Sequence, residues 1–249
     1  MAPEPERDRP AASAVPPDDR HAAVALFGER LALAERYADL LVTDGTVRGL
    51  VGPREAPRIW QRHLLNCAAL AELIPSGASV TDVGSGAGLP GLVLAVARPD
   101  LTVTLLEPMA RRTAFLTEVI EQLGLSGTVT VHRGRAEEVA GRLQPADVVT
   151  ARALAPLHQL AAWCLPLARV GGRVLALKGA SATEEVATHR EAIMGLGGGA
   201  PVVHRCAAAL LDPPAVVVEI RRERDPGSGG ARGNHPGAGR GRRTRHGRT

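Results

Sequence analysis

The stretch Val80-Thr-Asp-Val-Gly84-Ser-Gly86-Ala-Gly88-Leu-Pro-Gly91 decides the fold of this chain. A β-rich run, 79–83, precedes its glycines, and an apolar run of helical character, 89–97, follows them. Glycines are needed at such a strand-to-helix turn because the chain reverses sharply and its backbone N–H groups must approach a ligand closely. In an open α/β sheet this turn faces the ligand crevice, so the stretch predicts a binding site as well as a fold.

Two ligand classes are compatible with this turn. Gly86-x-Gly88-x-x-Gly91 matches the dinucleotide-binding pattern, which by itself is a weak signal. That pattern starts after the end of the strand, whereas Asp82-x-Gly84-x-Gly86-x-Gly88 starts on the strand itself. The Asp82 carboxylate would repel a pyrophosphate and attract a ligand with a cationic end. S-adenosyl-L-methionine carries an ammonium and a sulfonium, and it is the cofactor that we expect.

Beyond the turn, β-rich runs alternate with helical runs. The pattern predicts strands at 79–83, 101–106, 128–132, 147–151 and 173–177, with helices at 89–97, 111–123, 136–143 and 157–167. Strands that alternate with crossover helices form a parallel, doubly wound sheet. The last two runs, 202–210 and 215–222, are separated by Leu211-Asp-Pro-Pro214 without a helix, which predicts an antiparallel hairpin at the sheet edge.

The parts outside this pattern divide the chain into four segments. Apolar residues recur at helical spacing over 22–42, and a second helix is predicted over 56–73, so we expect a helical N-terminal cap at 21–75 before a main domain at 76–222. Residues 1–20 are rich in Pro, Ala and charge without periodicity, and 223–249 are Arg- and Gly-rich. Both are predicted to be flexible tails, the second of them basic.

Length and composition favour one ordinary globular core, since the chain has 249 residues, 45% hydrophobic and 22% charged. The longest apolar stretch, 92–97, is far shorter than the roughly 18 residues that a membrane helix needs, and the first residues lack a secretion signal. We therefore expect a cytoplasmic protein without a membrane partner. Cys67, Cys164 and Cys206 form no C-x-x-C pair, so neither a disulfide framework nor a metal site is predicted.

Two further motifs lie at the predicted carboxyl ends of strands. Glu107 ends the second strand about 20 residues beyond the glycines, where a carboxylate accepts ribose hydroxyls in both nicotinamide enzymes and methyltransferases. Arg135-Ala136-Glu137-Glu138 follows the third strand. It is placed to reach an adenine amino group, but a helix start with acids favoured by the dipole explains it equally well.

Together the motifs resemble those of the RsmG methyltransferases, also called glucose-inhibited division protein B. The resemblance covers roughly residues 25–222, and its most specific part is the Gly-Leu-Pro-Gly ending of the turn. The motifs that carry it, in chain order, are Asp82-Val-Gly-Ser-Gly-Ala-Gly-Leu-Pro-Gly91, Leu105-Leu-Glu-Pro108 with Arg111-Arg112 and Phe115-Leu116, Arg135-Ala-Glu-Glu138, Thr150-Ala-Arg-Ala153 and Ala176-Leu-Lys-Gly179.

The resemblance implies an α/β, class I S-adenosylmethionine-dependent methyltransferase with a Rossmann-like doubly wound sheet, mostly parallel with a C-terminal antiparallel hairpin, and a helical N-terminal cap. It implies methylation of N7 of guanine 527 in the 530 loop of 16S ribosomal RNA, with the RNA or the 30S subunit as partner. We separately expect the protein to be a monomer. Gly84 and Leu89 would contact the cofactor, with Ala136 and Glu137 near its adenine. Arg152 would lie at the mouth shared by cofactor and substrate.

The chemistry of guanine N7 sets what the remaining residues must do. N7 presents a free lone pair, so methyl transfer needs alignment more than a strong general base, and no catalytic His or Cys is expected. Arg152 and Lys178, at the ends of the fourth and fifth predicted strands, are the catalytic candidates, as donors to guanine O6 or a phosphate. The candidate RNA contacts are Arg62 and His63, which resemble the family's Arg-His element, and Arg111 and Arg112.

Two other functions are compatible with parts of the sequence. A nicotinamide-dependent oxidoreductase would use the same glycine turn, although Asp82 and the lack of a Tyr-x-x-x-Lys motif argue against it. A non-enzymatic RNA-binding protein would rely on the basic tail, where nine arginines lie between Arg221 and Thr249. A cofactor turn with all of its expected companions argues against this second alternative.

Overall fold

The computed structural model describes residues 13–225 and contains one seven-stranded sheet with the order β3-β2-β1-β4-β5-β7-β6. β1 to β5 run parallel, and β7 pairs antiparallel with both β5 and β6. This confirms the predicted doubly wound sheet with an antiparallel hairpin at its edge. The strands are β1 (Ser79–Val83), β2 (Thr102–Glu107), β3 (Val129–Arg133), β4 (Ala146–Arg152), β5 (Ala168–Lys178), β6 (Val202–Cys206) and β7 (Ala215–Arg221).

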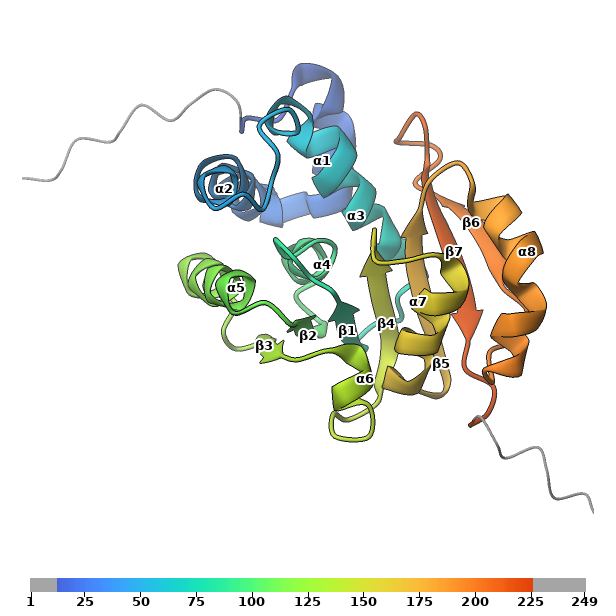
Figure 1. Cartoon of the computed structure of the whole chain (residues 1–249). Coiled ribbons are helices and arrows are strands. Elements are labelled where there is room, and N and C mark those ends of the chain that lie inside the picture. Colours follow the sequence, from blue (N-terminus) through green and yellow to red (C-terminus); the bar gives the residue numbers. More distant parts are fainter. Residues whose placement is uncertain (1–12, 226–249) are drawn as a thin grey trace, which may run out of the picture.

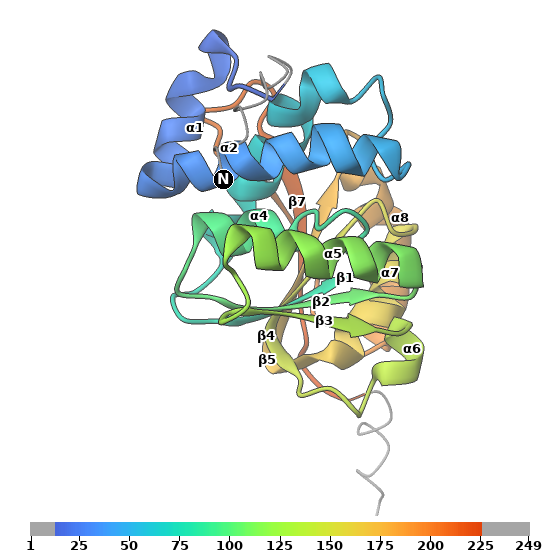
Figure 2. The ribbon, with the colours of Figure 1, turned by 90° about the vertical axis from the view of Figure 1, so that its left-hand side faces the viewer.

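Helices cover both faces of the sheet and a helical cap covers one side (Figure 1). Helices α4 (Gly91–Ala97) and α5 (Ala110–Leu123) lie on one face, while α6 (Ala136–Val139), α7 (Leu157–Cys164) and α8 (Ala182–Gly195) belong to the other. Figure 2 shows α1 (Arg20–Phe27) and α2 (Leu31–Leu40) stacked above α4 and α5. The cap therefore rests on helices as a third layer, and its apolar side chains share one core with α4 and α5.

The second helical part of the cap is one continuous helical segment of mixed geometry. It runs through a 3-10 turn (Ala56–Arg58), a π-helical segment (Ile59–Leu65), α3 (Asn66–Ala68) and another 3-10 turn (Ala69–Leu73). Its extent confirms the predicted helix at 56–73. The first predicted helix, 22–42, is interrupted at Gly28, which has a positive φ of 52°, and it continues past α2 as a π-helical segment (Leu41–Gly45).

The predicted tail at 1–20 ends earlier than expected. Residues 1–12 and 226–249 lie outside the described residues, as does most of the predicted basic tail. Ser13, however, is buried, and its carbonyl oxygen accepts a hydrogen bond of 2.7 Å from the Trp60 indole. A 3-10 turn (Pro17–Asp19) then leads into α1. The cap begins near residue 13 because the buried indole N–H needs an acceptor from this segment.

Three other elements differ from the prediction. α8 was not predicted, because most of its residues are exposed and only Ala182 and Ile193 are buried, which leaves no helical periodicity in the sequence. The predicted strand 202–210 ends at Cys206, where Ala207 takes a positive φ of 52° and starts a turn. The predicted helix 136–143 ends at Val139. Within residues 13–225 no helix is long and apolar enough to cross a membrane.

The register brings the carboxyl ends of the parallel strands to one edge. Val83 at the end of β1 pairs with Leu106 and Ala151, and Arg152 at the end of β4 pairs with Leu177. The glycine turn, Glu107, Arg152 and Lys178 therefore follow neighbouring strands at the same edge. This is where open α/β sheets bind ligands.

Candidate functional site

The glycine turn adopts the conformation that its sequence predicts. Gly84, Gly86 and Gly88 have positive φ values of 71°, 58° and 99°, which side chains other than glycine rarely adopt. A Cβ at Gly84 would lie 2.7 Å from Leu154 Cδ1, and a Cβ at Gly88 would lie 2.7 Å from the Tyr37 hydroxyl oxygen. Glycine is therefore needed at both positions for space as well as for conformation.

The Asp82 carboxylate lies beneath this turn. It is fully buried, and its two oxygens accept hydrogen bonds of 3.1 Å each, from the Gly91 amide and from the Thr150 hydroxyl. Burial raises the pKa of Asp82 to about 6. The sequence predicts that this carboxylate faces the cationic end of a ligand, whereas the structure shows it bracing the turn against the start of α4 and the neighbouring strand β4.

Glu107 joins the turn to β2. Its carboxylate accepts hydrogen bonds of 3.0 Å from the amides of Gly86 and Met109, and it is almost fully buried. Arg112 Nη1 lies 3.7 Å from Glu107 Oε2, and its Nε is buried without a hydrogen-bond partner in the part of the chain that the structure describes. Arg112 thus turns toward the glycine turn, whereas Arg111, the other predicted RNA contact on α5, is exposed.

A small cavity of about 120 Å³ opens beside Gly84. Gly134 to Glu137, which follow β3, form one wall, so the predicted adenine-side residues Ala136 and Glu137 do meet the glycine turn here. Leu89, also a predicted cofactor contact, is half-buried against the cap core and does not line this cavity. The lining residues are Val83, Gly84, Leu106, Pro108, Gly134, Arg135, Ala136, Glu137, Leu154 and Trp163.

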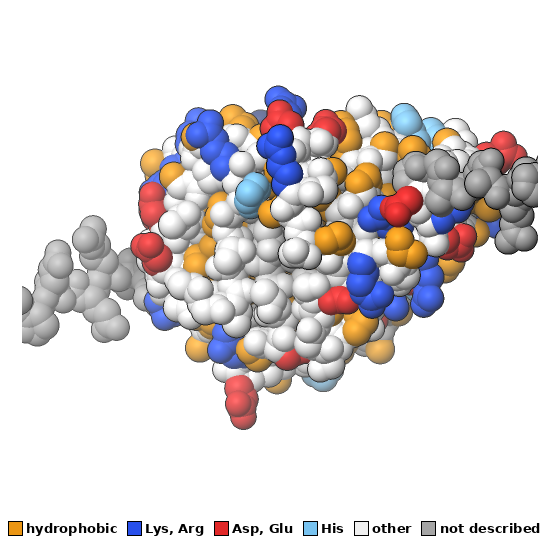
Figure 3. Space-filling model, turned by 90° about the horizontal axis from the view of Figure 1, so that it is seen from below, with side chains coloured by type: hydrophobic (Ala, Val, Ile, Leu, Met, Phe, Trp, Pro, Cys, Tyr) orange, Lys and Arg blue, Asp and Glu red, His pale blue; other side chains and the backbone are white. Residues whose placement is uncertain are grey.

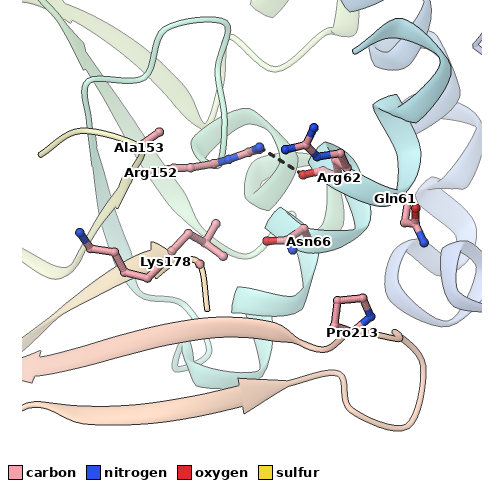
Figure 4. A pocket seen from close by; sticks show the side chains of 9 residues that line it. Gln61, Arg62, Asn66, Arg152, Ala153, Lys178 and Pro213 are labelled. Atoms are coloured by element: carbon pink, nitrogen blue, oxygen red, sulfur yellow. Dashed lines mark hydrogen bonds between the residues drawn. The ribbon is translucent and has the colours of Figure 1, made fainter. Parts of the chain in front are cut away.

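A larger cavity of about 450 Å³ lies on the other side of the end of β4. Figure 4 shows that its walls come from the cap, from the ends of β4 and β5, and from the connection between β6 and β7. The predicted residues Arg62, Arg152 and Lys178 all line it. The full set is Gln61, Arg62, Asn66, Arg152, Ala153, Leu177, Lys178, Gly179 and Pro213.

Arg152 connects β4 to the cap. Its Nη2 donates hydrogen bonds to the Arg62 carbonyl oxygen at 3.1 Å, drawn as a dashed line in Figure 4, and to His63 Nδ1 at 2.8 Å. Its Nη1 lies 3.2 Å from the Cys67 sulfur. A guanidinium has five N–H donors, so these contacts fix its plane and leave donors for the cavity.

His63 is half-buried and held in one tautomer. Because Arg152 can only donate, His63 Nδ1 must accept, and the proton on Nε2 is then donated to Glu55 at 2.9 Å. Burial, and next the Arg152 charge, lower the pKa of His63. Glu55 also pairs with Arg62 at 2.9 Å. The predicted RNA contact His63 is thus engaged within the protein, where it orients the two arginines.

Lys178 lines the same cavity as Arg152, and two hydrogen bonds hold its side chain in place. Its ammonium donates to the Ala155 carbonyl oxygen at 2.9 Å and to Glu185 on α8 at 2.8 Å. The same Glu185 oxygen accepts from the Leu157 amide at 3.1 Å, so this pair ties the segment after β4 in place. One N–H of the ammonium is left for a ligand. No sequence motif points to Glu185, because α8 has little apolar periodicity.

Residues 152–154 form a wall between the two cavities. Arg152 and Ala153 line the larger cavity, while Leu154 lines the smaller one and lies against Gly84. Ala153 adopts a φ of 51°, which is unusual for a residue other than glycine. The left-handed backbone at Ala153 turns the chain, so that Arg152 reaches the larger cavity and Leu154 reaches the smaller one. The Thr150-Ala-Arg-Ala153 motif predicted Arg152 at this place, but not the role of Leu154.

The surface charge on the underside of the molecule is mixed. On the face seen in Figure 3, Lys and Arg side chains are scattered and stand beside Asp and Glu side chains. The described residues of this face therefore offer nucleic-acid phosphates no continuous basic surface. No group of three or more His, Cys, Asp or Glu side chains within residues 13–225 could hold a metal ion.

Comparisons with known proteins agree on one family. The family model described as rRNA small subunit methyltransferase G matches residues 30–210. A curated ribosomal RNA small subunit methyltransferase G from Salinispora tropica is 66% identical over 220 residues, covering 86% of this chain and 91% of that protein. Its counterpart from Corynebacterium efficiens is 55% identical over 205 residues, covering 82% of this chain and 88% of that protein.

Solved structures show a likeness in fold. The crystal structure titled cofactor-bound Rv0187 from MTB has a TM-score of 0.51 with 18% identity, covering 85% of this chain and 99% of that one. At this identity the likeness concerns the fold alone. It supports the sheet, its helices and their order.

We predict that acid destabilises the fold through His63. Its pKa in the folded state lies below the ordinary 6.5, so the unfolded chain binds a proton that the folded chain does not. The stability contributed by neutral His63 is complete above the unfolded-state pKa and is lost as the pH falls toward the folded-state value. For one proton the slope is at most about 1.4 kcal/mol per pH unit.

The measurement is urea unfolding between about pH 7.5 and about pH 5.5 for the wild type and for His63→Asn, whose carbonyl can still accept from Arg152 but does not titrate in this range. The wild type should lose more stability on acidification than His63→Asn does. The exposed His21→Asn serves as the matched control and should follow the wild type. If the unfolding free energies of the wild type and of His63→Asn changed in parallel with pH, His63 would not be the source of the acid sensitivity.

Proposed function

This chain belongs to the rRNA small subunit methyltransferase G family, and we propose that it methylates N7 of guanine 527 in the 530 loop of 16S ribosomal RNA. S-adenosylmethionine is its cofactor. The observation that carries the proposal is the arrangement of two cavities on either side of residues 152–154, one against the glycine turn and one lined by Arg62, Arg152 and Lys178. Methyl transfer requires two ligands that meet at one point, and both cavities border residues 152–154.

The smaller cavity suits the adenosine end of the cofactor. Glycine at position 84 lets the Leu154 side chain lie against the turn, and apolar side chains at Leu106, Leu154 and Trp163 can pack on a flat ring. The Glu107 carboxylate is almost fully buried and does not line this cavity, but it holds the Gly86 amide of the turn and has lone pairs left to accept from ribose hydroxyls. When bound, the cofactor supplies a methyl group made electrophilic by its sulfonium.

Asp82 acts in this proposal as a positioning residue. Its carboxylate is already occupied by Gly91 and Thr150, so it holds the turn in shape and contributes negative charge from below. Arg112 Nη1 lies 3.7 Å from Glu107 Oε2, on the side of the glycine turn. We therefore place Arg112 on the cofactor side, and keep Arg111, which is exposed, as an RNA contact.

The larger cavity suits the target base. Its volume is within the range of small-ligand sites, and its walls carry cationic donors. Guanine presents O6 next to N7, so the free donors of Arg152 and Lys178 can hold O6 while N7 faces the wall. Alignment is the main requirement, because the N7 lone pair needs no deprotonation. Arg62 at the rim is placed to meet a phosphate, and His63 positions it through Glu55.

The partner that we propose is 16S RNA or the 30S particle that contains it, which places the enzyme in the cytoplasm with the ribosomes. Both cavities are complete within residues 13–225 of one chain. A monomer therefore suffices for the proposed reaction.

Replacing Gly84 with Asp should abolish cofactor binding while the sheet still folds. The new side chain would meet Leu154 and fill the smaller cavity. We expect affinity for S-adenosylmethionine, measured by calorimetric titration, to fall by about 100-fold or more, a loss of roughly 2.7 kcal/mol. The matched control is Gly141→Asp, because Gly141 also has a positive φ of 82° but a Cβ there meets nothing within 4 Å. Equal affinities in the two variants would refute the placement of the cofactor.

The reaction itself is tested by methyl transfer to 30S particles, or to 16S RNA, that lack the modification. Labelled S-adenosylmethionine supplies the methyl group, and borohydride reduction followed by aniline cleavage maps 7-methylguanosine. We expect one new cleavage, at guanine 527, and none with the Gly84→Asp variant. Label at another nucleotide, or no transfer by a protein that binds the cofactor, would overturn the proposed target.

A further inference from the structure

The larger cavity contains hydrogen-bond donors in excess, and this asymmetry has a chemical consequence for the base it accepts. Arg62, Arg152 and Lys178 can donate but cannot accept. Among the described lining residues, only two side chains carry an acceptor oxygen, the carboxamides of Gln61 and Asn66. Gln61 is exposed to solvent, whereas Asn66 is half-buried.

Asn66 is free to bind a ligand. No hydrogen bond involves its carboxamide within residues 13–225, although its neighbours Arg62 and Arg152 are bonded to each other. Figure 4 shows its side chain directed into the cavity, between Arg152 on one side and Pro213 on the other. A half-buried amide with unused donors and acceptors is costly unless a ligand or water completes its hydrogen bonds.

Guanine has the complementary edge. If N7 faces the wall formed by Arg152 and Ala153, the opposite edge of the purine faces the far side of the cavity, where Asn66 lies. That edge presents two adjacent donors, N1–H and the 2-amino group, which arginine and lysine cannot satisfy. Adenine presents an acceptor at N1 and has no 2-amino group, so an acceptor in this place favours guanine.

We propose that Asn66 is the residue that reads the target base as guanine, with its Oδ1 accepting hydrogen bonds from N1–H and the 2-amino group. This assignment rests on the proposed methylation of guanine N7. It divides the cavity into two parts: the cationic groups hold O6 beside the reacting atom, and the amide holds the opposite edge.

The test compares three variants on two substrates. Asn66→Leu keeps the volume without the amide, Asn66→Asp keeps the acceptor, and Gln61→Leu removes the other carboxamide as the matched control. The substrates are 30S particles reconstituted with 16S RNA that carries either guanine or inosine at the target position, since inosine lacks only the 2-amino group. The measured quantities are kcat and KM for methyl transfer, together with the affinity of each variant for S-adenosylmethionine.

The wild type should prefer guanine to inosine by about tenfold, the effect of one unsatisfied hydrogen bond in a desolvated site. Asn66→Leu should lose about tenfold or more in kcat/KM on guanine and lose the preference, while binding the cofactor normally. Asn66→Asp should retain activity and preference, and Gln61→Leu should behave like the wild type. If the role of Asn66 were purely structural, Asn66→Leu would lower kcat/KM equally on both substrates and would leave the preference for guanine unchanged.

Each other outcome overturns the inference. An undiminished preference in Asn66→Leu, a lost preference in Gln61→Leu, or a loss of cofactor affinity in Asn66→Leu would remove Asn66 as the reader. Failure of the proposed function is recognised separately, because the wild type would then leave no 7-methylguanosine at the target position of the guanine particle.

Discussion

The buried carboxylate of Asp82 is the constraint on which the rest of the site depends. It is fully removed from solvent at the centre of the sheet, and its pKa of about 6 reflects the cost of that burial. Its hydrogen bonds to Gly91 and Thr150 offset part of this cost, and they join β1 to the start of α4 and to β4. The glycine turn is therefore anchored at its base, and the residues above it are free to face a ligand.

A second constraint comes from the cap, which completes the site instead of merely covering the sheet. The cap supplies Arg62, His63 and Asn66, and the Arg152 guanidinium binds this segment to β4. Without it the larger cavity would lose the wall that faces Lys178. Residues from the two ends of the described chain also meet here, because Pro213 between β6 and β7 closes the same cavity. Residues 152–154 border both this cavity and the smaller one beside the glycine turn.

Much of the fold could be predicted from the sequence, because alternating apolar runs and glycine spacing are local signals. The parallel strands, the edge hairpin and the meeting of Arg152 with Lys178 at one edge follow from such signals. What could not be predicted depends on side-chain direction and on contacts between distant segments. The sequence places Asp82 on a strand but does not show that its carboxylate turns under the glycines. Nor does it show that Glu185, on a helix with little apolar periodicity, holds Lys178.

We propose that the cofactor and the target base occupy different cavities on either side of residues 152–154. A crystal structure of the protein with S-adenosylhomocysteine tests this most directly. We expect density for the adenosine between Gly84 and Ala136, on the side of the turn that Glu107 holds, with the cavity between Lys178 and Asn66 left open for the base. Ligand density in the larger cavity, against Arg62 and Lys178, would contradict it.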